Sequence, residues 1–187
     1  ARARGYEGAR VAALFPDNVP ATVYDNLIAS VRNNFEPLYR YYHLRRRLMG
    51  LDQLHAYDTY VPIIGDLQVH RSWDQATDLV LESLVPLGAE YCETLAAGLR
   101  GRWCDRYPNQ GKQSGAFSAG SFVGDPYILM NYKPEVLNDV FTLTHEAGHS
   151  MHSFNSSASQ SFEYYNYTIF VAEVASTFNE QLLSDTI

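Results

Sequence analysis

The chain has 187 residues, of which 46% are hydrophobic and 19% charged, and it carries a formal net charge of −7 at pH 7. This length allows one domain with a sizeable core or two small domains, and the composition is typical of a soluble globular protein rather than a disordered one. The negative charge argues against a nucleic-acid partner, since tracking phosphates requires a basic face. No apolar run approaches the roughly 20 residues that cross a bilayer, so no membrane partner is expected either.

The two cysteines, Cys92 and Cys104, are too few for a disulfide framework and do not by themselves make a zinc site. Reduced thiols are usual in the cytoplasm, and we therefore expect a cytoplasmic protein. The main basic cluster, Arg45–Arg47, is interpreted as a solvated helix face. The chain opens with ARARGYEGAR and no initiator Met, which is compatible with a start inside a longer natural protein. The oligomeric state is left open.

The first part of the chain is expected to be mostly helical. A short helix is predicted from about Tyr6 to Phe15, and a long one from Ala21 to near Gly50, where apolar residues recur at spacings of three and four. These recurring residues are Val23, Leu27, Ile28, Val31, Phe35, Leu38 and Tyr42. The aromatic stretch HAYDTYVPIIGD, residues 55–66, is interpreted as an extended connector.

The middle of the chain changes from helix to short strands. Ser72 and Gln75 have the spacing of a capping box and predict a second long helix towards Trp103, which Pro86 kinks or splits because it lacks an amide donor. After Trp103 a glycine-rich stretch contains two candidate strands, GAFSAGSF and PYILMNY.

The last part of the chain is predicted to hold two helices. One begins at Lys133-Pro134 and carries HEAGH, and a loop over roughly residues 156–167 separates it from another that starts near Thr168. The pattern predicts a mainly α fold with a small β-sheet (α+β). Residues 1–187 are expected to form a single unit, with 1–103 as a mostly helical scaffold and 104–187 as the sheet and the two last helices.

The HEAGH stretch predicts a metal site with a base. His145 and His149 are four residues apart, so a helix places them on one face, where both imidazoles can bind one ion. Glu146 lies beside the first histidine and can reach a metal-bound water without itself becoming a ligand. Gly148 and Ala147 are small, which helps if another part of the chain passes close by.

A catalytic zinc ion needs a third protein ligand. His152 shares the stripe of the two histidines, but seven residues of helix rise about 10.5 Å, which is too far for His145 and His152 to bind one ion. His152 is therefore interpreted as a packed residue, or as one that contacts the ligand residues and orients them without binding the metal. Glu173 is the better candidate, because Ala, Val and Phe surround it and a buried carboxylate needs a partner. A glutamate on a solvated stripe is the alternative.

The motifs together resemble a known family. HEAGHSMHSF followed by YTIFVAEVASTFNEQLL is similar to the oligoendopeptidase F branch of the thimet oligopeptidase family of zinc peptidases. The stretches PDNVPATVYDNLI, LHAYDTYVP, RWCDRYPNQGKQSGAFSAGS and DPYILMNY resemble the same branch in the same order, so the likeness covers nearly the whole chain. It implies the zincin-like catalytic core of an oligopeptidase, truncated to a central fragment of a longer and mostly helical enzyme.

The resemblance also implies roles for individual residues. His145, His149 and Glu173 would bind one Zn²⁺ per chain, and Glu146 would be the general base. Ser176 and Glu180 would support the ligands from behind, as His152 does in the interpretation above.

The same resemblance points to the strand around PYILMNY as the sheet edge on which an extended peptide lies. The substrate-binding candidates on it are Tyr127, Ile128, Leu129 and Asn131.

The leading hypothesis is a zinc metallopeptidase that hydrolyses short peptides. In the family, the His and Tyr residues that grip the substrate carbonyl follow the zinc-binding Glu in a segment beyond these 187 residues. We therefore expect this chain alone to bind zinc but to cleave peptides poorly or not at all. A zinc-binding domain without peptidase activity is the second hypothesis, and a helical interaction domain with an accidental HExxH is the third.

Overall fold

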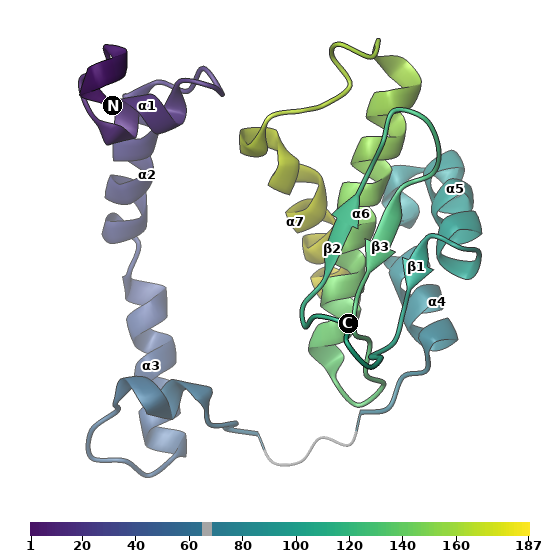
Figure 1. The fold of residues 1–187 in the computed structure, drawn as a ribbon. Helices are drawn as coiled ribbons and strands as arrows, with labels where there is room; N and C mark the ends of the chain where they lie inside the picture. Colours follow the sequence, from purple (N-terminus) through teal and green to yellow (C-terminus); the bar gives the residue numbers. More distant parts are fainter. Residues whose placement is uncertain (65–68) are drawn as a thin grey trace. The chain divides into compact units, whose positions relative to one another are not determined.

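The computed structural model describes residues 1–64 and 69–187, which group into two compact units, Ala1–Leu67 and Gln68–Ile187 (Figure 1). The boundary between the units lies just before the helix at Trp73, whereas the change from helices to sheet lies between Arg100 and Cys104, inside the second unit. The expectation that residues 1–187 act as a single unit stays a prediction.

The first unit contains three α-helices, α1 (Ala9–Leu14), α2 (Ala21–Asn33) and α3 (Glu36–Leu48), and two 3-10 segments, η1 (Arg2–Arg4) and η2 (Ala56–Tyr60). The prediction of one long helix here was wrong, because the helix ends at Asn33 and a new one begins at Glu36. Pro37 lies in the first turn of α3, where its missing amide costs little, whereas inside a continuous helix its ring would clash with the preceding turn. The predicted connector forms η2 instead, and its residues 65 and 66 lie outside the described part of the chain.

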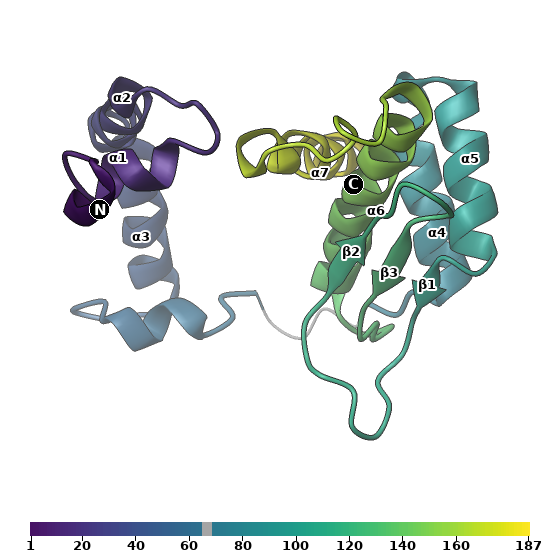
Figure 2. The same ribbon diagram turned by 45° about the horizontal axis from the view of Figure 1, so that its top comes forward.

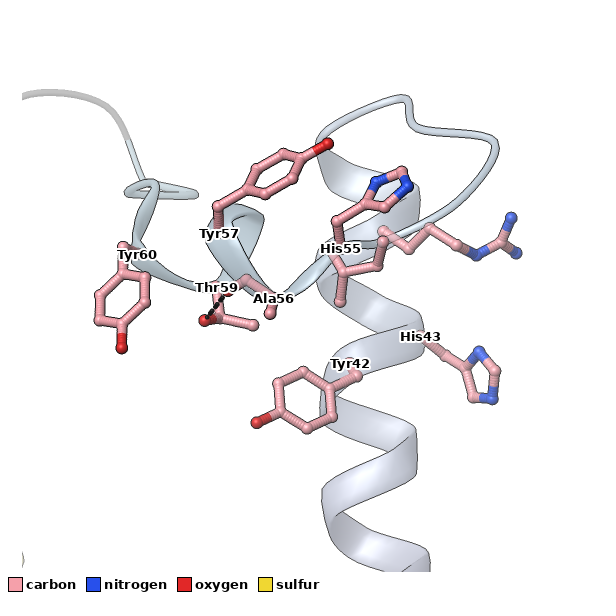
Figure 3. A pocket seen from close by; sticks show the side chains of 9 residues that line it. Tyr42, His43, His55, Ala56, Tyr57, Thr59 and Tyr60 are labelled. Carbon is pink, nitrogen blue, oxygen red and sulfur yellow. Dashed lines mark hydrogen bonds between the residues drawn. The ribbon is translucent and has the colours of Figure 1, made fainter.

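Among its described residues the first unit buries no apolar side chain. Arg45 is 5% exposed, so the interpretation of this arginine as part of a solvated face was wrong. Its guanidinium donates to the Tyr41 hydroxyl at 3.2 Å and to the Asp58 and Val61 carbonyls, which ties α3 to η2. A pocket of about 840 Å³ lies between these two segments (Figure 3). The residues that line it are Tyr42, His43, Arg46, Leu54, His55, Ala56, Tyr57, Thr59 and Tyr60.

The second unit begins with α4 (Trp73–Ser83), η3 (Val85–Leu87) and α5 (Ala89–Arg100). The Ser72 hydroxyl accepts from the Gln75 amide and the Gln75 side chain accepts from the Ser72 amide, so the predicted capping box is confirmed. Pro86 lies in η3 and splits the predicted helix in two. Gly88, with φ 98°, begins the second part, in a backbone conformation that side chains with a Cβ rarely adopt.

Three short strands follow, β1 (Cys104–Asp105), β2 (Phe117–Ala119) and β3 (Tyr127–Leu129). They form one sheet in the order β1-β3-β2, with β3 parallel to β1 and antiparallel to β2. Two long helices complete the unit, α6 (Leu137–Ser159) and α7 (Ile169–Thr186). The helix that carries HEAGH thus begins after a turn that follows Lys133, later than predicted, and the last helix begins where it was expected. The predicted mainly α fold with a small β-sheet is confirmed.

Helix α6 is the centre of the second unit. The strands lie across one face of α6 and α7 runs alongside it, while α4 and α5 pack from the other side (Figures 1 and 2). The buried apolar side chains come from the four helices, from β3 and from the segments that flank them: Trp73, Ala76, Val80, Leu84, Leu95, Leu99, Trp103, Ile128, Met130, Tyr132, Val140, Leu143, Ala147, Met151 and Leu183. None of the helices in the described parts of the chain combines the length and hydropathy that a bilayer span requires.

Helices α6 and α7 approach each other most closely at Gly148. A Cβ at this position would lie 2.7 Å from the Ser176 Cα and 2.8 Å from the Ala175 carbonyl oxygen, both backbone atoms of α7. The predicted use of a small residue for a close chain passage is confirmed here. Because backbone atoms cannot rotate away as a side chain can, only glycine permits this spacing of the two helices.

Only the second unit has an apolar core among the described residues, so the same substitution should cost more there than in the first unit. Leu99→Ala removes a fully buried side chain and is expected to lower the free energy of unfolding of the second unit by about 2–5 kcal/mol. Leu48→Ala, in the first unit, removes a side chain that is 61% exposed and should change stability by about 0.5 kcal/mol or less. Urea unfolding followed by circular dichroism measures both. Equal costs at the two positions would contradict the placement of the core.

Gly148→Ala is expected to destabilise the packing of α7 on α6. Alanine would gain about 1 kcal/mol of helix propensity in an exposed helix, but here the clash with the α7 backbone should outweigh it by about 1–3 kcal/mol. Thermal unfolding and amide exchange along α7 measure the effect. Gly8→Ala is the matched control, because a Cβ there meets nothing within 4 Å. An equally stable Gly148→Ala protein would refute the close approach.

Candidate metal centre

Three potential ligands meet where α6 faces α7. The Nε2 atoms of His145 and His149 lie 3.1 Å apart, and each lies 3.3 Å from Oε2 of Glu173. A tetrahedral zinc ion with ligands at about 2.0–2.1 Å places neighbouring ligand atoms about 3.3–3.4 Å apart. The donor set and its spacing therefore fit a zinc ion with two imidazole nitrogens and one carboxylate oxygen.

Two neighbours on α7 hold these ligands in place. Oε1 of Glu180 lies 2.5 Å from Nδ1 of His145, so the carboxylate accepts the Nδ1 proton and leaves the lone pair of Nε2 directed at the cluster. The buried hydroxyl of Ser176 donates to Oε2 of Glu173 at 2.8 Å. Both contacts follow from the helix period, since Ser176 and Glu180 share the face of Glu173.

The electrostatics of the cluster favour the protonation states that bind metal. The hydrogen bond from Ser176 is the main cause that lowers the pKa of Glu173; burial opposes it, and the nearby His149 and His145 lower the pKa further. Burial lowers the pKa of His149, which favours the neutral imidazole. A carboxylate and a neutral imidazole are the forms that coordinate a dication.

Glu146 stands apart from the three donors in a drier environment. It is 7% exposed. Burial raises the pKa of its carboxyl group, and the negative charge of Glu173 adds to this, while His145 and the backbone amide of Ser118 act in the opposite direction. Glu146 thus places a carboxyl group next to the three donor residues without being one of them.

His152 lies outside the cluster. Its ring stacks on Tyr167, with ring centroids 3.6 Å apart and planes at 6°. Burial is the main cause that lowers the pKa of His152. The structure therefore brings His145, His149, Glu173, Ser176 and Glu180 together and places His152 in an aromatic stack.

The strand order corrects one expectation from the sequence. β3 pairs with β1 on one side and β2 on the other, so it is the central strand and has no free edge for an added peptide. The expectation that the Tyr127–Leu129 strand is the edge was wrong, because strands of three residues carry too little pattern to fix their order. Ile128 is fully buried, and the Asn131 side chain donates to the carbonyls of Gln113 and Gly115.

β2 is the strand with a free edge on this side of the sheet. Ile128 and Met130 donate their amides to β1 and its continuation, at the Trp103 and Asp105 carbonyls. Backbone groups alternate in direction along a strand, so the residues on either side of Ile128 face β2. In β2 they lie opposite Phe117 and Ala119.

Ser118, between these two, consequently directs its N–H and C=O away from the sheet. Its amide faces the Glu146 carboxylate. The sequence pattern predicts a strand over this stretch but not its place at the edge of the sheet. The alternation of Phe117, Ser118 and Ala119 gave no signal for this role, because the apolar residues are exposed and the serine is half-buried, the reverse of the usual pattern.

Comparison with known proteins places these motifs in one family. The model of peptidase family M3 matches residues 1–186. Oligopeptidase PepF of Bacillus subtilis is 46% identical over 99% of this chain and 28% of its own length. The oligoendopeptidase F homolog of Borreliella burgdorferi is also 46% identical, over 99% of this chain and 32% of its own length. The chain thus spans about a third of the length of these relatives.

Solved structures agree with the sequence comparisons. A protein from Chlamydophila abortus superimposes with a TM-score of 0.85 at 42% identity, over 100% of this chain and 31% of its own. Oligoendopeptidase-F from Enterococcus faecium superimposes with a TM-score of 0.59 at 31% identity, over 99% of this chain and 24% of its own. With a family model that covers nearly every residue, the chain belongs to peptidase family M3.

Proposed function

We propose that this chain carries the zinc-binding catalytic core of an oligopeptidase that hydrolyses short peptides, with one zinc ion per chain and a cytoplasmic location. The observation that carries the proposal is the cluster of His145, His149 and Glu173, with donor atoms 3.1–3.3 Å apart and Glu146 beside it. Family membership supports the peptidase class, and the relatives' names describe oligopeptidases.

The residues of the chain divide the chemistry between them. His145, His149 and Glu173 would hold the zinc ion, which when bound activates water and polarises a carbonyl group. Glu146 takes a proton from the attacking water at its carboxylate and later delivers it to the leaving amine. Its buried environment suits this exchange, because burial raises the pKa of the carboxyl group towards the neutral pH range, where it can both accept and donate a proton.

The free edge of β2 is the place where we propose that an extended peptide lies. Ser118 directs one N–H and one C=O to this edge, which is the pairing that strand addition requires, although its N–H must turn from the Glu146 carboxylate to a peptide carbonyl when the peptide binds. The edge faces Glu146, so the peptide backbone and the base meet on the same side of α6. This role passes to β2 from β3.

A zinc-binding domain without peptidase activity is the second candidate function. The same three donors favour it, and it differs only in giving Glu146 no task. Against it stands the burial of Glu146, since a carboxyl group that is 7% exposed and serves no purpose would be costly to retain.

Two substitutions separate these functions. In Glu146→Gln, hydrolysis of an internally quenched peptide is expected to fall by about 10²–10⁴-fold because the base is lost, while zinc content is retained. Loss of a hydrogen bond that only supports a ligand lowers metal affinity about 10–100-fold. Glu173→Ala removes a ligand itself, so zinc affinity should fall by more than this. Elemental analysis and initial rates, with protein in excess over peptide, give both results.

Glu163→Gln is the matched control, since it changes an exposed glutamate in the loop before α7. Zinc binding that survives Glu173→Ala unchanged would refute the three-ligand site. Hydrolysis and zinc content that both stay unchanged in Glu146→Gln would remove the proposed task of this glutamate and favour the second function.

A further inference from the structure

A polar contact joins β2 to α6 beside the proposed site. The hydroxyls of Ser118 and Ser150 lie 2.8 Å apart. Ser150 is fully buried and Ser118 is half-buried between two exposed neighbours in its strand. The contact links segments that are 32 residues apart in the chain, so it fixes where the strand lies on the helix.

The position of this contact relates it to the proposed base. Ser150 follows Glu146 by four residues, so both side chains occupy the same face of α6, one turn apart. One turn further, a Cβ on Gly120 would lie 2.5 Å from the Ser153 Cβ, so the strand continues against the helix beyond the two serines. β2 is thus held along the face that carries Glu146.

Ser150 has another partner within reach and does not use it. A serine in a helix can donate to the carbonyl four residues before it, as the Thr144 hydroxyl does to Val140 at 2.8 Å. The Ser150 hydroxyl bonds across to the strand instead. Ser118 lies opposite Ile128, which is fully buried, where an apolar residue would also pack and would suit a strand better. The two hydroxyls therefore fix the orientation of β2 and its distance from α6, and they do not serve to bury apolar surface.

We propose that the Ser118–Ser150 hydrogen bond is a latch that positions the free edge of β2 against Glu146. The two serines act through the strand edge and the base, and they are positioning residues that do not touch the peptide with their side chains. This proposal rests on the proposed peptidase function, because the latch is proposed to align the backbone of a bound peptide with Glu146.

Ser118→Ala and Ser150→Ala test the latch in the zinc-loaded chain. Each is expected to lower kcat about tenfold, since small misplacements of reacting groups are costly, and to change KM less than about twofold, since the backbone groups of the edge remain. The double variant should be no slower than either single variant, because both remove one bond. Ser118→Thr keeps a hydroxyl and should restore kcat. Ser157→Ala, which removes a hydroxyl bonded within α6, is the control.

Amide exchange provides a readout that does not depend on activity. In the metal-free chain, Ser150→Ala should speed exchange of the Ser118 amide about tenfold or more while the amides of α6 keep their protection. A melting temperature that falls while kcat and Ser118 exchange stay unchanged would overturn the latch, as would additive losses in the double variant. Hydrolysis that Glu146→Gln leaves unchanged would defeat the peptidase proposal. The exchange experiment decides separately whether the latch exists, including the case in which this chain alone cleaves too slowly to measure.

Discussion

The spacing between α6 and α7 at Gly148 is the constraint on which the candidate metal centre depends. The glycine lies directly before the second ligand histidine, and the α7 backbone occupies the space that a Cβ would need. Glu173 lies three residues before Ser176, the residue that contacts Gly148, and so reaches both imidazoles at 3.3 Å. A wider helix spacing would move the carboxylate out of range while leaving the two histidines on α6 in place.

Glu146 and Glu173 lie in different environments, and this difference separates their proposed roles. Glu173 is exposed and accepts a hydrogen bond from Ser176, which lowers its pKa and favours the carboxylate that binds a cation. Glu146 is buried, which raises its pKa and favours proton exchange. Carboxyl groups whose surroundings drive their pKa values apart typically divide acid–base work from charge stabilisation. Here the fold achieves this with one carboxylate on each of two packed helices.

Local rules predicted a large part of this structure. The four-residue spacing of His145 and His149, the Ser72 capping box and the break at Pro86 all act within one or two turns of chain, so the sequence determines them directly. The break before α3 had a signal too, in Pro37, which the apolar periodicity obscured. Glu173 was proposed because apolar neighbours in the sequence predict a buried carboxylate that needs a partner, but its side chain is 54% exposed, so this premise was wrong.

Features that depend on distant contacts were not predictable in this way. The order of three strands with two or three residues each follows from pairing across loops, and no periodicity records it. The apolar stripe of α2 predicts a buried face, yet Leu27 is 62% exposed and the described first unit has no apolar core. The burial of Arg45 depends on carbonyl acceptors in η2, which spacing along α3 alone does not predict.

X-ray absorption spectroscopy of the zinc-loaded chain would show which atoms bind the metal. Binding by His145, His149 and Glu173 predicts a first shell of light atoms only, with two imidazole nitrogens at about 2.0–2.1 Å and a carboxylate oxygen at about 2.0–2.2 Å. The outer-shell scattering of two imidazole rings should accompany it. Sulfur scattering at about 2.3 Å, or a spectrum without imidazole scattering, would contradict a centre built from His145, His149 and Glu173.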